Sequence, residues 1–111
     1  MDNPKDRIYI DHILEAIGLI EGFIAGKSLE EFREDPLLYS AVTRQIEVIG
    51  EAAKRLSEEI KTKFSALPWR RISGMRDVLI HDYMDVDLEI LWKAATEDIR
   101  ELKEILGKNS A

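Results

Sequence analysis

The chain has 111 residues, of which 45% are hydrophobic and 34% are charged, with a net charge of −6 and no cysteine. This length supports one hydrophobic core, so we expect a single domain over residues 1–111. The absence of cysteine excludes disulfides, thiolate metal sites and a cysteine nucleophile, and makes the cytoplasm the expected compartment. Charged residues interrupt the longest apolar stretch, residues 8–25, so no membrane span is predicted. The acidic balance argues against broad, nonspecific binding to nucleic acid.

The first quarter of the chain shows helical periodicity. Apolar residues recur three or four apart over residues 5–25, which predicts an amphipathic helix that stops at Gly26. Gly18, Gly22 and Gly26 follow one another at four-residue spacing and form a ridge without side chains. This ridge favours close helix packing, either within one subunit or across a dimer.

The next segment predicts a short helix followed by a long one. Ser28 with Glu31 three residues later has the capping-box pattern that opens a helix. Pro36 separates this short helix from the next one, because the residue before a proline avoids helical geometry. Residues 37–64 then carry an apolar residue every three or four positions, which predicts one long second helix.

The remaining sequence predicts two more helices and so defines the fold class. Pro68 suits the first turn of a third helix, and Asp85 or Asp87 is placed to cap a fourth helix that ends at Gly107. Four amphipathic helices with short connections predict an all-α, up-and-down antiparallel bundle, with the short helix as an extra element. The predicted core positions of the fourth helix are Leu88, Leu91, Trp92, Ala95, Ile99, Leu102 and Leu106.

Arg76, His81 and Tyr83 form an R-x4-H-x-Y pattern at the end of the third predicted helix. A guanidinium close to an imidazole can hold a phosphate and move a proton near neutral pH. At about 100° per residue, Arg76 and Tyr83 differ by only about 20° around a helix, whereas His81 lies about 140° from Arg76. Either the helix unwinds near Ile80 or a second subunit completes the site, because a two-fold axis would bring two copies of each residue into one cleft.

Such a composite site has the groups that RNA cleavage needs. One His81 could take the proton of a ribose 2′-hydroxyl, the arginines could hold the nonbridging oxygens, and the second His81 or water could protonate the leaving 5′-oxygen. Arg70 and Arg71 are the candidate contacts to RNA phosphate. No metal-binding spacing such as H-E-x-x-H is present, so no metal is expected. The candidate supporting carboxylates are Glu51, which we expect to pair with Arg76, and Asp77 and Asp82.

Each of these residues also has a purely structural interpretation. His81 could cap a helix C-terminus, Arg76 could pair with Asp77, Glu51 or Asp82 on the surface, and Tyr83 could be a core ring. His12, the other histidine, is expected to be a boundary residue of the first helix. The two tryptophans, Trp69 and Trp92, are expected to anchor packing.

Taken together, five segments of the sequence resemble the HepT-like toxins of the HEPN superfamily. They are PWR at 68–70, MRD at 75–77, IHDY at 80–83, DLEILW at 87–92 and RQIEVIGEAA at 44–53. The resemblance covers nearly the whole chain, and the three fixed positions of R-x4-H-x-Y are intact.

The resemblance implies a function and a mode of control. It implies an all-helical homodimeric ribonuclease, needing no metal or cofactor, with Arg76 and His81 catalytic in a cleft shared by both subunits. It also implies a partner, an MntA-like minimal nucleotidyltransferase antitoxin of the type VII kind, which uses ATP to transfer AMP to Tyr83. AMP on Tyr83 would add charge and bulk where RNA phosphate must bind.

A second function remains open from the sequence. The net charge of −6 favours a noncatalytic module that binds a nucleotide or docks a nucleotidyltransferase without cleaving RNA.

Overall fold

The computed structural model describes residues 3–80 and 87–108, and that part of the chain contains helices and no strand. Three long helices come first: α1 (Pro4–Ile24), α3 (Pro36–Arg55) and α5 (Trp69–Ile80). The fourth long segment is a rod made of α6 (Leu88–Lys93), the π-helical turn η1 (Ala94–Asp98) and α7 (Ile99–Lys108). Two short helices, α2 (Leu29–Glu34) and α4 (Glu58–Lys63), connect the long ones. None of the described helices is long and apolar enough to cross a membrane.

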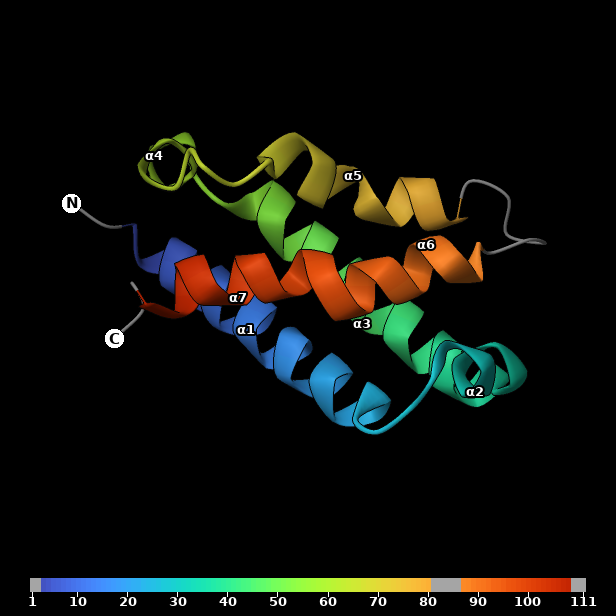
Figure 1. The fold of residues 1–111 in the computed structure, drawn as a ribbon. Coiled ribbons are helices and arrows are strands. Elements are labelled where there is room, and N and C mark those ends of the chain that lie inside the picture. Colours follow the sequence, from blue (N-terminus) through green and yellow to red (C-terminus); the bar gives the residue numbers. More distant parts are fainter. Residues whose placement is uncertain (1–2, 81–86, 109–111) are drawn as a thin grey trace.

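The long segments form an up-and-down bundle (Figure 1). Helix α3 packs along α1 on one side and along α5 on the other, and successive long segments run in alternating directions. The rod of α6, η1 and α7 lies across this layer and contacts α1 and α3. The predicted all-α bundle is therefore confirmed.

Local signals account for the ends of the first two helices. The Asn3 side chain accepts a hydrogen bond from the Lys5 N–H at 2.9 Å and caps α1, whose first residue is a proline. After α1, Gly26 takes a φ of 73°, a left-handed conformation that glycine adopts without strain. The predicted capping box is present, and the hydrogen bond from the Ser28 N–H lowers the pKa of the Glu31 carboxyl.

Among the described residues, nothing packs closely against the glycine ridge. A Cβ added at Gly18, Gly22 or Gly26 would meet no atom within 4 Å. Close packing within one subunit is therefore wrong as an explanation of this spacing, and packing across a dimer stays a prediction.

The predicted single helix over residues 37–64 is wrong, because the chain breaks at Leu56 and Ser57. Leu56 and Ser57 are extended, with ψ of 144° and 157°, and the Ser57 hydroxyl caps α4 by accepting from the Ile60 N–H. Asp6 of α1 holds this break in place, since its carboxylate accepts from the Ser57 N–H at 2.8 Å and from its hydroxyl at 2.5 Å. The apolar periodicity of the sequence continues through the break. The break therefore depends on the contact between Ser57 and Asp6, which lie 51 positions apart.

The predicted fourth helix also differs from the structure in two details. It is interrupted by the π-helical turn η1, where the Thr96 hydroxyl donates to the Trp92 carbonyl at 2.8 Å and competes with the backbone ladder. Helix α7 extends one residue beyond Gly107, to Lys108, because a glycine close to a helix end need not stop it.

The core confirms most of the predicted packing positions. Leu91, Ala95, Ile99, Leu102 and Leu106 are all buried. Trp69 is buried, and its indole N–H donates to the Phe64 carbonyl at 3.0 Å. Trp92 is half-buried and lies with its ring centroid 5.0 Å from that of Phe32. Both tryptophans therefore anchor packing, as predicted.

Candidate functional site

Helix α5 carries the first part of the R-x4-H-x-Y segment on a well-anchored scaffold. Its first turn is fixed by the buried side chains of Trp69 and Ile72, and it packs along α3. Arg76 and Asp77 lie in the second half of this helix, whose described part extends to Ile80. The backbone of Arg76 is therefore held by the core rather than by a surface loop.

The rest of the motif lies outside the described residues. His81, Asp82 and Tyr83 belong to residues 81–86, so their roles, the unwinding near Ile80 and the shared cleft stay predictions. The same holds for Asp85 as a helix cap and for the pairing of Arg76 with Glu51.

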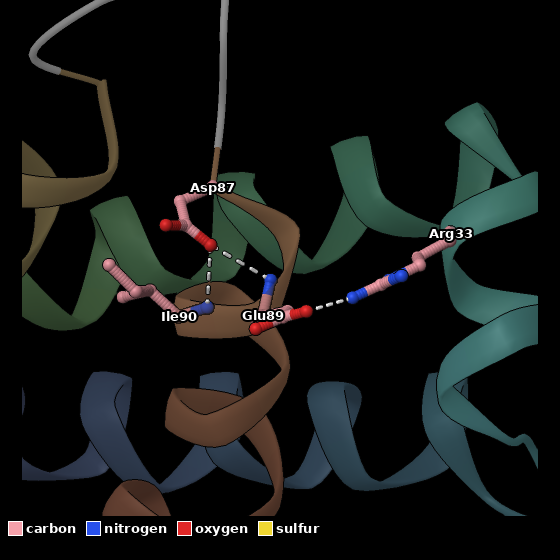
Figure 2. Close-up of polar contacts among 4 residues, drawn as sticks. All are labelled: Arg33, Asp87, Glu89 and Ile90. Carbon is pink, nitrogen blue, oxygen red and sulfur yellow. Dashed lines mark hydrogen bonds and ion pairs between the residues drawn. The ribbon is translucent and has the colours of Figure 1, made fainter.

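The chain re-enters the described structure at a firmly capped helix (Figure 2). The Asp87 carboxylate accepts from the N–H groups of Glu89 and Ile90, each at 3.1 Å, so the predicted cap of the fourth helix is confirmed for Asp87. The Glu89 carboxylate in turn pairs with Arg33 of α2. The segment that contains His81 and Tyr83 thus ends on a helix whose first turn is tied to α2.

The two candidate phosphate contacts differ in what surrounds them. Arg71 forms an ion pair with Asp98 of η1 at 3.2 Å, with the two side chains 62% and 27% exposed. Arg70 is exposed and has no ion-pair partner among the side chains of residues 3–75 and 87–108. Arg70 is therefore more accessible to a phosphate than Arg71. The Arg71–Asp98 pair instead links α5 to the C-terminal rod.

A feature that the sequence did not reveal lies between α1 and α3. Two adjoining grooves of about 290 and 300 Å³ open there. His12 lines both of them and is exposed on α1, whereas a boundary residue, as predicted, would be half-buried. Glu51 is half-buried and lines the second groove together with Arg44 and Arg55. The spacing of Arg44, Glu51 and Arg55, at i, i+7 and i+11, was the one signal that could have indicated it.

Among the side chains that the structure describes, no three histidine or carboxylate groups cluster as metal ligands would, and the expectation that no metal is needed stays a prediction.

The described part of the chain defines an all-helical bundle whose third long helix carries Arg76, and comparison with known proteins identifies the family. The profile described as "Ribonuclease HepT-like" matches residues 13–108. The chain therefore belongs to the HepT-like ribonuclease family.

Three curated relatives illustrate the match. A provisionally named RNase of Caldanaerobacter subterraneus subsp. tengcongensis is 43% identical over 92% of this chain and 95% of its own. The probable ribonuclease HepT of Thermococcus cleftensis is 44% identical over 86% of both chains. A protein of Methanocaldococcus jannaschii, named as a gamma-glutamylcyclotransferase and provisional RNase, is 44% identical over 92% of this chain but only 46% of its own length. No solved structure matches.

Proposed function

We propose that this protein is a metal-independent endoribonuclease and the toxin of a HepT/MntA-type pair, active as a homodimer. The observation that carries the proposal is an intact R-x4-H-x-Y motif in the sequence, with its arginine on the core-anchored helix α5, in a chain whose relatives are named RNases. The two ends of the motif segment are fixed by α5 and by the Asp87 cap, which suits a site that must hold a phosphate in one geometry.

In this proposal the chemistry is an internal transfer at phosphorus. His81 takes the proton of the ribose 2′-hydroxyl, whose oxygen attacks the adjacent phosphorus. Arg76 binds the nonbridging oxygens and stabilises the charge that builds on them. The bond to the 5′-oxygen breaks, and that oxygen takes a proton from the second His81 or from water. The products are a 2′,3′-cyclic phosphate and a free 5′-hydroxyl. Because the guanidinium supplies the positive charge, no metal is required.

The test is cleavage of a defined RNA by purified protein in excess EDTA. We expect Arg76→Ala and His81→Ala to lower the rate by about 10²–10⁴-fold, the usual contribution of a positioned acid, base or charge. Arg100→Ala is the matched control, because Arg100 is an exposed arginine of α7, away from the motif helix. Unchanged cleavage by either motif variant would refute its catalytic role, and loss of all activity in EDTA would refute metal independence.

We further propose that AMP transfer to Tyr83 by an MntA-like nucleotidyltransferase switches the enzyme off. Each AMP would place phosphate charge and an adenosine beside Arg76 and His81 and so occupy the position of the RNA phosphate. Incubation with that partner and ATP should add mass in whole AMP units, and Tyr83→Phe should abolish the gain. The chain has three tyrosines, and Tyr9 and Tyr39 serve as internal controls. A modified Tyr9 or Tyr39 peptide would place the switch elsewhere.

The second candidate function is a noncatalytic docking module, which the net charge of −6 favours. The two functions differ in a growth assay. A toxin arrests growth when expressed without its partner, and His81→Ala relieves the arrest. Growth that is equally slowed by wild type and by His81→Ala would support the docking module.

A further inference from the structure

The basic corner is the part of the bundle formed by residues 54–71, where α3 ends, α4 follows and α5 begins (Figure 1). This segment holds six lysines and arginines against two glutamates, a net charge of +4, so the rest of the chain carries −10. Positive charge that gathers at one place on an acidic protein is typical of a surface for a negatively charged partner. The six basic residues are Lys54, Arg55, Lys61, Lys63, Arg70 and Arg71.

Helix α4 separates the charges of the corner along its axis. Glu58 and Glu59 lie in its first turn, where the helix dipole favours negative charge. Lys61 and Lys63 lie in its last turn, where the dipole favours positive charge. The lysines are therefore on the side of α4 that leads into α5.

A buried hydrogen bond joins the end of α4 to the start of α5. The Trp69 indole N–H donates to the Phe64 carbonyl at 3.0 Å. Lys63 directly precedes Phe64, its ammonium lies 5.4 Å from the centre of the Phe64 ring, and Arg70 directly follows Trp69. Both Lys63 and Arg70 are exposed. Two exposed cations from different helices are thus held at one corner by a contact of the core.

Most cations of the corner are not neutralised by a neighbour. Arg71 pairs with Asp98, but the other five form no ion pair with any side chain that the structure describes. Outside the corner, by contrast, one cation on each of α1, α2, α3 and α7 has a carboxylate partner. The positive charge of the corner is therefore available to a partner.

The corner has charge but little exposed apolar surface. The large exposed hydrophobic residues of the described chain are Ile8, Leu19, Leu37 and Ile90, and none of them lies within residues 54–71. A protein interface has an apolar centre, and a site on a membrane surface inserts apolar side chains, so both fit the corner poorly. The backbone of a nucleic acid requires only cations that reach its phosphates.

The opposite end of the bundle is acidic, which gives the molecule a direction. Helix α2 lies at that end (Figure 1), and its only basic residue, Arg33, is paired with Glu89. Helix α3, with 20 residues and so about 30 Å long, separates the two ends. A polyanion is therefore attracted to the corner and repelled from the α2 end. The acidic residues of α2 and its C-cap are Glu30, Glu31, Glu34 and Asp35.

Helix α5 connects the basic corner to the motif. Arg70 lies in its first turn, and the backbone of Arg76 lies about 9 Å further along the helix, at 1.5 Å per residue. A strand held at Arg70 thus needs to extend by only this distance to reach the position of Arg76.

We propose that the basic corner binds the phosphate backbone of the RNA substrate outside the bond that is cut, with Lys63 and Arg70 as the central contacts and Lys54 and Lys61 beside them. This surface rests on the ribonuclease of the proposed function and names where its substrate is held. The strand runs along α5 toward Arg76 and away over α4, because the α2 end repels it. The contacts are to phosphate alone, so they position the RNA without reading its bases.

The first experiment measures RNA binding without cleavage. A His81→Ala protein is titrated into a fluorescent single-stranded RNA at several KCl concentrations, and anisotropy gives the Kd. Adding Lys63→Ala and Arg70→Ala should raise the Kd at least about tenfold and lower the slope of log Kd against log[KCl] by about 1.4, since each lost phosphate contact removes about 0.7. An unchanged Kd and slope would overturn the proposal.

Lys27→Ala combined with Arg100→Ala is the matched control in the same background, because it removes the same charge away from the corner. Both residues are exposed without a described ion-pair partner, and Arg100 lines a groove at the end of α1 with Ala25. The control should bind RNA as its background does. Equal losses in the two double variants would show that only net charge matters and would overturn the corner. Circular dichroism verifies that each variant keeps its helices.

The class of ligand is tested with other probes. Poly(U), poly(A) and poly(C) should lose the same affinity in the corner variant, because Phe64 and Trp69 are buried and offer no ring to a base. A loss confined to one of these polymers would contradict contacts to phosphate alone. Tighter binding to phosphatidylserine vesicles than to RNA would assign the corner to a membrane surface and overturn the proposal.

The second experiment uses the active enzyme and substrates of two lengths. For a long single-stranded RNA, Lys63→Ala with Arg70→Ala should raise KM at least about tenfold and leave kcat unchanged, because the contact is the same in the ground and transition states. A dinucleotide, which cannot reach from the motif to the corner, should be cut equally by wild type and variant. An equal loss on the dinucleotide would place these residues in the chemistry or the fold instead.

Binding and cleavage keep this proposal distinct from the proposed function. RNA binding that depends on Lys63 and Arg70, in a protein that cuts no RNA, would leave the corner standing and refute the ribonuclease. Cleavage of long RNA with an unchanged KM in the corner variant would leave the ribonuclease standing and refute the corner.

Discussion

At the scale of single residues, Asp6 shows how one side chain fixes a change in chain direction. It is the one charged side chain buried among the described residues, with 3% of its surface exposed. A buried carboxylate is tolerated when hydrogen bonds replace its hydration, and Ser57 supplies two of them, from its N–H and its hydroxyl. The same hydroxyl accepts from the Ile60 N–H and so caps α4. One residue of α1 thereby determines where α3 ends and α4 begins.

Asp6→Asn should therefore destabilise the fold by about 1–3 kcal/mol, because it replaces the two charge-assisted hydrogen bonds to Ser57 with weaker neutral ones. Chemical denaturation followed by circular dichroism measures this loss. Asp11→Asn is the matched control on the same helix, since Asp11 is exposed and forms an exposed pair with Arg7. Its cost should stay below about 0.5 kcal/mol. Equal effects of the two substitutions would contradict the role given to Asp6.

At the scale of elements, the helices obey local rules except where a distant contact intervenes. The Asn3 cap, the Ser28–Glu31 capping box and the Asp87 cap act within three residues, so they are legible in the sequence. The π-helical turn could not be predicted from the sequence, although it places Asp98 where it pairs with Arg71 of α5. The C-terminal rod is thus linked to the helix that carries the motif by a pair that the spacing did not indicate.

The glycines of α1 give a test at this scale. Gly18 lies inside a helix with nothing within 4 Å of its missing Cβ, so Gly18→Ala should stabilise the fold by about 0.5–1 kcal/mol through backbone entropy. Gly26→Ala should destabilise it by about 1–2 kcal/mol, because Gly26 has a φ of 73°. Thermal unfolding of both variants measures the opposite shifts. A Gly18→Ala variant that lost the dimer would instead support packing of this ridge across subunits.

At the scale of the whole molecule, the homodimer of the proposed function would determine which subunit supplies Arg76 and which supplies His81. The described part of one subunit holds the backbone of Arg76 on α5. If the site is shared, Arg76 of one copy serves with His81 of the other, as the angular offset of these positions in a straight helix suggests.

Mixing two inactive variants tests this arrangement. Arg76→Ala and His81→Ala subunits that exchange at random form heterodimers with one intact pair across the two copies. Their mixture should recover up to about a quarter of the wild-type cleavage rate, since half of the dimers are mixed and each keeps one of its two Arg76–His81 pairs, with water in place of the second His81. The measurement compares the RNA cleavage rate of the mixture with the rates of the two variants kept apart. No recovery, with exchange verified by mass, would place both groups in the same subunit.

The sequence by itself determined the fold class, most helix boundaries, the caps and the buried stripe of the last helix. These depend on contacts three or four residues apart, which a single chain displays directly. The sequence also indicated the family, through segments such as IHDY at 80–83. The tertiary structure alone decided the contact that holds the break at Ser57, the Arg71–Asp98 pair and the two grooves between α1 and α3. The first two join residues 51 and 27 positions apart, and no local pattern records which distant side chain will arrive.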